Sequence, residues 1–149
     1  AGHQMKIIRG IFLLFLLPGS AIAANPCVVP GSAVELEMTR KMLEDTGLTA
    51  AVSGLPIMEQ LAETPVSQPL ALQYAAASRT RDQLRLGDIV LTLDDYFSTF
   101  YDYHAVNLVV KYTYLSPDSK KNIFIGSSLV NEEECSIRFN GYITVQREF

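Results

Sequence analysis

The tripeptide Asp102-Tyr103-His104 holds the only histidine that follows residue 3 of the chain. Residues two apart point the same way on a strand, so Asp102 could orient His104 as a general base. An acidic neighbour beside a surface histidine is also a common chance pattern, and no Gly-x-Ser-x-Gly motif accompanies it. We therefore expect no enzymatic activity, and we take Tyr101, Asp102, Tyr103 and His104 as candidate binding residues.

Aromatic side chains crowd the same part of the chain in larger number than one strand face can bury. They are Tyr96, Phe97, Phe100, Tyr101, Tyr103, Tyr112 and Tyr114. Exposed tyrosines next to acidic groups are typical of protein-binding surfaces, because tyrosine combines a large contact area with a hydrogen-bonding end. The alternative is that these rings form the sheet core and cross-strand pairs. The residue types alone leave both interpretations open.

No pattern in the chain predicts a metal ion or a cofactor. A lone histidine is too little for a zinc site once the cysteines are paired, and Gly126-Ser127-Ser128 lacks the lysine of a phosphate-binding loop. The run Glu132–Glu134 indicates a solvated turn, with the steering of a basic partner as the alternative. Four aspartates lack the spacing of a calcium loop and indicate a solvated patch: Asp88, Asp94, Asp95 and Asp102.

Residues 5–23 have the order of parts of a secretory signal peptide. Lys6 and Arg9 form a basic start, an apolar run follows, and small residues at its end predict cleavage between Ala23 and Ala24. The apolar run is shorter than the roughly 17 to 25 residues that span a hydrocarbon core. We therefore expect a periplasmic or secreted protein with no stable membrane insertion after cleavage.

Residues 1–4 precede the start methionine and are typical of a tag scar, which leaves residues 24–149 as one globular domain. Removal of the two leader cations leaves ten basic against sixteen acidic side chains, a net charge of −6. A domain with this negative net charge is not expected to bind nucleic acid, which requires a basic surface. The partner we expect is another protein of the envelope or an exported effector.

The two cysteines, Cys27 and Cys135, stand near the two ends of this domain. Export to an oxidising compartment predicts a disulfide between them. The bridge would close a loop of about 100 residues. The chain-entropy model predicts that such a bridge stabilises the folded state by roughly 4 to 5 kcal/mol. The absence of a Cys-x-x-Cys motif favours a structural over a redox role.

The first part of the domain has helix signals. Ser32 and Glu35 form a capping-box pattern, and Gly47 is placed to end the helix that follows. A short helix is predicted over 56–63 and a longer one over 67–86, since a proline stands in the first turn of each. Four side chains of the longer helix are expected to face the core: Leu70, Tyr74, Ala77 and Leu84.

The rest of the chain is rich in strand-forming residues. The expected strands are 106–114, 121–130, 136–139 and 142–146. Ser116–Ser119 predicts a turn, and Asn140-Gly141 is a strong signal for a hairpin between the last two strands. An amphipathic helix over 96–110 remains an alternative.

The predicted fold is therefore α+β, with about three N-terminal helices packed on a C-terminal antiparallel sheet of roughly four strands. This element order resembles the cone-shaped nuclear-transport-factor-2-like and cystatin-like groups. Our first hypothesis is a noncatalytic exported protein-binding domain, such as an inhibitor, an immunity protein or a secretion or assembly accessory factor. The alternatives are a small-ligand-binding or hydrolytic domain with a cone-shaped cavity near Asp102 and His104, and a structural envelope component that self-associates.

Overall fold

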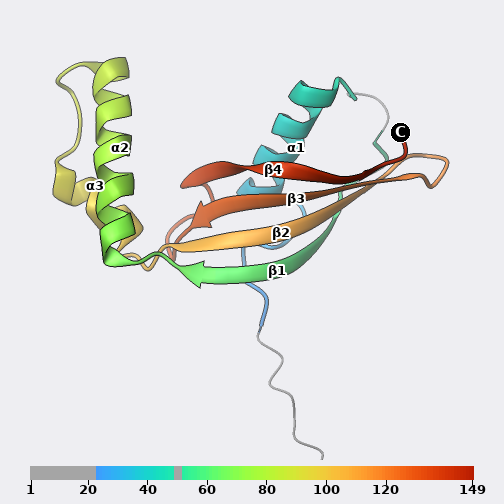
Figure 1. Cartoon of the computed structure of the whole chain (residues 1–149), viewed down its shortest axis with the longest axis horizontal. Coiled ribbons are helices and arrows are strands. Elements are labelled where there is room, and N and C mark those ends of the chain that lie inside the picture. Colours follow the sequence, from blue (N-terminus) through green and yellow to red (C-terminus); the bar gives the residue numbers. More distant parts are fainter. Residues whose placement is uncertain (1–22, 49–51) are drawn as a thin grey trace, which may run out of the picture.

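The computed structural model describes residues 23–48 and 52–149, so the predicted tag scar and nearly all of the predicted signal peptide lie outside the described residues. The elements follow one another as α1 (Ala33–Thr46), β1 (Ile57–Pro65), α2 (Gln68–Leu86), α3 (Leu93–Phe100), β2 (Val106–Leu115), β3 (Lys121–Val130) and β4 (Arg138–Arg147) (Figure 1). The α+β class is confirmed for this part of the chain. The prediction that every helix precedes the sheet is wrong, because β1 lies between α1 and α2.

Helix α1 begins and ends where its sequence signals predict. The Ser32 hydroxyl accepts a hydrogen bond from the Glu35 amide at 3.3 Å, which satisfies one of the free N–H groups of the first turn. Gly47 ends the helix with φ 69°, in the left-handed region that favours glycine. The buried face of α1 carries Val34, Met38 and Met42, which pack against the sheet.

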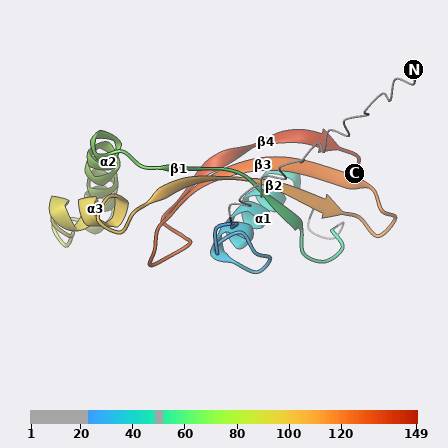
Figure 2. The same ribbon diagram turned by 90° about the horizontal axis from the view of Figure 1, so that it is seen from below.

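The four strands form one antiparallel sheet in chain order, β1-β2-β3-β4. The sheet arches over α1, which packs on its concave side (Figure 2). Strand β2 alternates as predicted and turns Leu108, Val110, Tyr112 and Tyr114 toward α1. Phe124 on β3 meets Tyr114 edge to face, with ring centroids 5.8 Å apart.

Helices α2 and α3 pack on each other and stand at one end of the sheet, away from α1 (Figure 1, Figure 2). Their base has a small core of its own, made of Val66, Ala71, Ala75, Phe100, Ala105 and Leu129. The Tyr96 hydroxyl of α3 donates to Asp82 of α2 at 2.9 Å. The pair of helices, which we call the α2–α3 hairpin, is thus anchored at its base and projects beyond the sheet.

Two predicted elements are wrong. The helix expected over 56–63 is strand β1, because its backbone pairs with β2 from Ile57 opposite Thr113 to Pro65 opposite Val106. The hairpin turn expected at Asn140-Gly141 does not exist, since both residues lie inside β4. The register between β3 and β4 shifts there, and Gly141 has φ 132°, so this glycine serves a bulge.

The predicted disulfide between Cys27 and Cys135 is confirmed, across a sequence separation of 108. Cys27 is 2% exposed and belongs to the core beneath the sheet, beside Val34. The bridge ties the segment before α1 to the connection between β3 and β4.

Candidate functional site

The predicted binding residues Tyr101–His104 form a turn between α3 and β2. The Tyr103 amide donates to the Ser98 carbonyl at 3.0 Å, and the His104 amide donates to the Tyr101 carbonyl at 3.0 Å. His104 has φ 52°, a left-handed conformation that a strand does not allow. The strand geometry from which we expected Asp102 and His104 to point together is therefore absent in this segment.

The two ionisable side chains of the turn, Asp102 and His104, have different partners. The Asp102 carboxylate accepts from the Ser98 hydroxyl at 2.7 Å, one turn back on α3. The His104 Nδ1 atom lies 3.1 Å from a carboxylate oxygen of Glu132, and both of these side chains are well exposed. The carboxylate beside the His104 imidazole is therefore that of Glu132, from the β3–β4 connection, and the Asp102 carboxylate is bonded to Ser98 instead.

Asp102 and His104 nevertheless line one pocket of about 490 Å³. Tyr101 is a third side chain from the predicted site, and the remaining wall comes from Pro65, Val66, Ala105 and Val106. The lining of the pocket thus combines apolar side chains with a carboxylate and an imidazole. This combination suits a small ligand with a polar end.

The aromatic side chains divide between the two interpretations of the sequence. Tyr112 and Tyr114 are fully buried in the core, and burial raises the pKa of both phenols. Tyr101 and Tyr103 are 40% and 45% exposed, and Tyr101 stacks on Phe97 with ring centroids 5.2 Å apart. The predicted binding tyrosines therefore lie at the surface, whereas the strand tyrosines are structural.

The end of the α2–α3 hairpin exposes a group of apolar side chains that the sequence analysis missed. Leu84 and Ile89 are 87% and 86% exposed. Single exposed leucines are ordinary on a protein surface, but several close together are not. We call this group the hairpin tip; it consists of Leu84, Leu86, Ile89, Leu91 and Leu93. Leu84 was expected in the core from helical periodicity, and that expectation is wrong, as it is for Leu70 and Ala77.

The local structure explains why the hairpin tip is exposed. Helix α2 enters the small core through Ala71 and Ala75, and none of its residues after Ser78 is buried. Gly87 ends α2 with φ 70°, and α3 begins at a capping box between Thr92 and Asp95. The last turn of α2 and the connection to α3 thus extend past every neighbouring element of the described chain.

Acidic groups surround the hairpin tip. Asp88 lies in the connection, and Asp94 and Asp95 lie in the first turn of α3. Hydrogen bonds from Thr92 lower the pKa of Asp95 below its ordinary value. Arg85 is the one cation between residues 84 and 95.

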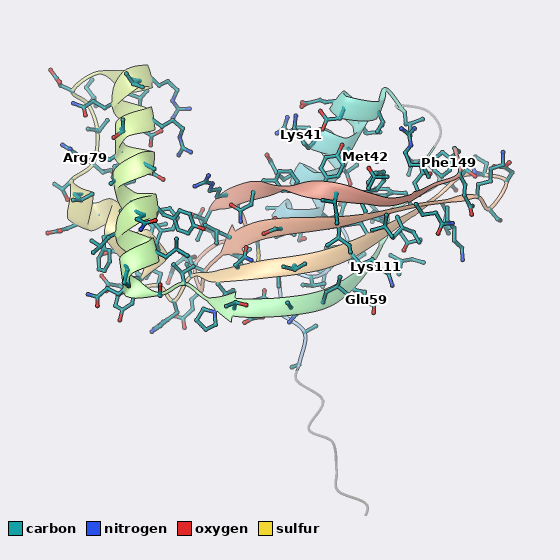
Figure 3. All side chains as sticks on the ribbon, in the orientation of Figure 1. Lys41, Met42, Glu59, Arg79, Lys111 and Phe149 are labelled. Carbon is teal, nitrogen blue, oxygen red and sulfur yellow. A yellow bond between two sulfur atoms is a disulfide. The ribbon has the colours of Figure 1, made fainter. Side chains whose placement is uncertain are left out.

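A second set of exposed apolar residues lies on the open face of the sheet, opposite α1. Its most exposed members are Ile57, Ile143 and Val145. The ion pair between Lys111 and Glu59 lies on the same face (Figure 3). This face therefore mixes apolar with charged groups, whereas the hairpin tip concentrates its apolar side chains in ten consecutive residues, 84–93.

Within residues 23–48 and 52–149, no group of three or more histidine, cysteine or acidic side chains is arranged to hold a metal ion. No helix in the same part of the chain is long and apolar enough to cross a membrane. No protein-family model matches the sequence, and neither a curated protein nor a solved structure matches it. The function must therefore be argued from the surface of the molecule itself.

Proposed function

We propose that this chain is a small noncatalytic protein-binding domain that acts outside the cytoplasm and docks its partner through the hairpin tip. The observation that carries the proposal is the exposure of five large apolar side chains at the end of a projecting helical hairpin. Exposing them to water is unfavourable by about 25 cal/mol for each Å² of apolar surface. A partner that covers the tip would recover this free energy.

The charges around the hairpin tip favour a protein over a membrane surface. Anionic lipid attracts basic segments, whereas the three carboxylates Asp88, Asp94 and Asp95 flank the tip and outnumber the cations there. These cations are Arg85 and Arg79, whose guanidinium donates to the Leu91 carbonyl at 3.4 Å. An apolar centre with a polar rim is the usual composition of a protein interface. The partner surface we expect is an apolar groove with basic groups at its edge.

The predicted leader and the Cys27–Cys135 disulfide support a location outside the cytoplasm. An acidic, disulfide-linked domain of this size suits an inhibitor, an immunity protein or an assembly accessory factor. Within these roles the partner is another envelope protein or an exported effector.

Site-specific photo-crosslinking in the producing cells tests the proposal. A photo-reactive residue in place of Leu91 is expected to give one discrete adduct with a different protein, which mass spectrometry identifies. The same residue in place of Lys120, in the β2–β3 turn, is the control and is expected to give none. Leu84→Ser combined with Ile89→Ser should abolish the Leu91 adduct without changing the thermal midpoint, because both side chains are already in water.

Three results would contradict the proposal. Adducts only between two copies of the chain would favour a self-associating envelope component. Adducts only with lipid would assign the tip to a membrane surface. Equal adducts from positions 91 and 120 would show that the tip has no selective partner.

A second candidate function is the binding of a small ligand, and the pocket of about 490 Å³ beside Asp102 and His104 favours it. Native mass spectrometry of the full chain would then show a bound small molecule. Tyr101→Ala and His104→Ala should each release it, whereas the Leu84→Ser and Ile89→Ser variants should retain it. Retention of the molecule by the two pocket variants would reject this candidate.

A further inference from the structure

A basic cleft of about 500 Å³ lies between α1, α2 and the beginning of β4. Its lining includes Arg40 and Lys41 from α1, Arg81 from α2 and Arg138 from β4. Figure 3 shows Lys41 on the side of α1 that faces α2, whereas Arg79 points away from this space toward the α2–α3 connection. Four of the ten cations that follow residue 23 thus gather in one cleft of an acidic domain.

Two of these four cations, Arg40 and Lys41, have a carboxylate oxygen within 3.0 Å. Arg40 is held between Glu37 and Glu44, and Lys41 pairs with Asp45 at 3.0 Å. Glu37 is also the only acidic residue in the lining of the cleft. These pairs hold the cations of the α1 wall, so the two arginines from α2 and β4 are the less constrained ones.

Arg81 and Arg138 have donors to spare. Arg81 forms one long ion pair, in which its Nε atom lies 3.6 Å from Oδ1 of Asp82, while the other Asp82 oxygen accepts from Tyr96 at 2.9 Å. The remaining donors of the Arg81 guanidinium stay available. Arg138 has no ion pair and no side-chain hydrogen bond within the described residues. Its guanidinium instead lies over the Tyr74 ring, 5.3 Å from the centroid, which positions it by a cation–π contact. Two guanidinium groups on different walls of one cleft are therefore available to bind carboxylates.

The form of the cleft suits an extended chain. Along α1 its lining runs from Ala33 to Lys41, a rise of about 12 Å at 1.5 Å per residue. An extended segment of about four residues covers that length. The floor comes from Ile137–Phe139 at the start of β4, and β4 is an edge strand with one side of its backbone unpaired in the sheet.

We propose that this cleft binds an extended, acidic segment of the protein partner, with Arg81 and Arg138 as the groups that hold its carboxylates. The inference rests on the proposed protein-binding function and adds a second contact to it. The hairpin tip supplies apolar contact area, and the cleft selects for acidic side chains.

Fluorescence anisotropy of a labelled oligoglutamate peptide with the purified full chain tests the cleft at low salt. The wild-type chain is expected to bind oligoglutamate and to leave oligoglutamine free. Arg81→Gln combined with Arg138→Gln should raise the Kd about tenfold, because both charge-assisted contacts are lost. The matched control combines Arg85→Gln with Arg147→Gln, which removes the same charge from the same two elements outside the cleft, and it should stay within about twofold.

Amide shifts measured by NMR on the wild-type chain provide a test that needs no variant. Addition of oligoglutamate should move the amides of Arg138 and Phe139 and leave the β2–β3 turn unchanged. The proposal is overturned if the wild-type chain binds no oligoglutamate, if both double variants lose affinity equally, or if the shifts map elsewhere. If the wild-type chain binds no oligoglutamate but gives the Leu91 crosslink, the cleft alone is rejected. If the wild-type chain binds oligoglutamate in the cleft but gives no Leu91 crosslink, the hairpin tip is rejected as the docking site.

Discussion

Gly126 of β3 lies against the ring of Tyr112 on β2. A Cβ atom at position 126 would stand 3.1 Å from ring atom Cε2 of Tyr112 and 3.2 Å from the sulfur of Met38 on α1. These separations are shorter than ordinary van der Waals contact. The missing side chain therefore lets the Tyr112 ring and α1 both lie close to the middle of the sheet.

Gly126→Ala is expected to destabilise the fold by about 1 to 3 kcal/mol, because the added methyl forces the ring or the helix to move. Urea denaturation followed by circular dichroism measures the change. Ser127→Ala is the control: its side chain lies on the opposite face of the sheet, and its effect should be clearly smaller. An unchanged midpoint for Gly126→Ala would show that α1 can shift at little cost.

Tyr112→Phe is expected to stabilise the protein by about 1 kcal/mol, because the buried Tyr112 hydroxyl has no hydrogen-bond partner among the described residues. Tyr114→Phe should have the opposite sign, since the Tyr114 hydroxyl shares a hydrogen bond of 2.8 Å with Thr39. The two variants remove the same atom from adjacent positions of one strand face. Urea midpoints compare them directly, and a loss of stability in Tyr112→Phe would mean that its hydroxyl finds a partner.

Replacing both Cys27 and Cys135 by serine should lower the free energy of unfolding by about 3 to 5 kcal/mol, because the bridge closes most of the domain into one loop. In urea denaturation, reductant should lower the free energy of unfolding of the wild-type chain by a similar amount. It should leave that of the double variant unchanged. Equal midpoints for the wild-type chain with and without reductant would contradict a stabilising bridge.

The parts of the fold that the sequence predicts correctly depend on local signals. Ser32 and Gly47 mark the ends of α1 by hydrogen bonds and backbone angles that need no distant neighbour. Strand β2 is evident because one face is buried, which produces strict alternation of apolar and polar residues. The disulfide is predictable because the chain has two cysteines, which allow one intramolecular pairing.

The errors arise where distant contacts decide the structure. Segment 57–65 contains good helix formers, yet pairing with β2 makes it a strand. The Asn140-Gly141 pair has turn geometry in most sequences, but here a register shift against β3 uses the glycine as a bulge. Leu84 fits the helical spacing of apolar residues, but that spacing does not show that α2 extends beyond the residues it packs against.

The candidate site was only partly predictable for the same reason. Tyr101–His104 lie at the surface and three of these four residues line a pocket, yet the partner of His104 is Glu132, 28 positions further along the chain. The basic cleft joins α1, α2 and β4, and no local pattern reveals that Arg81 and Arg138 share it.

The hydrogen bond from Tyr96 to Asp82 predicts how pH acts on the α2–α3 hairpin. It lowers the pKa of Asp82 below the ordinary value of 3.8, with the charges of Arg81 and Arg85 acting in the same direction. A carboxylate with a lowered pKa stabilises the folded state above its unfolded pKa, and this contribution is lost as pH falls through the folded pKa. The hairpin should therefore loosen below about pH 4.

Hydrogen-exchange protection of the α3 amides, corrected for intrinsic rates, measures this loosening in the wild-type chain and in Tyr96→Phe. At pH 6 the variant should show lower protection, because Asp82 has lost its donor from α3. On acidification the wild-type protection should fall toward that of the variant, while the loss of the Thr92–Asp95 capping box affects both chains alike. The difference between the two chains thus isolates the Tyr96–Asp82 bond, and parallel curves would show that this bond does not hold α3 on α2.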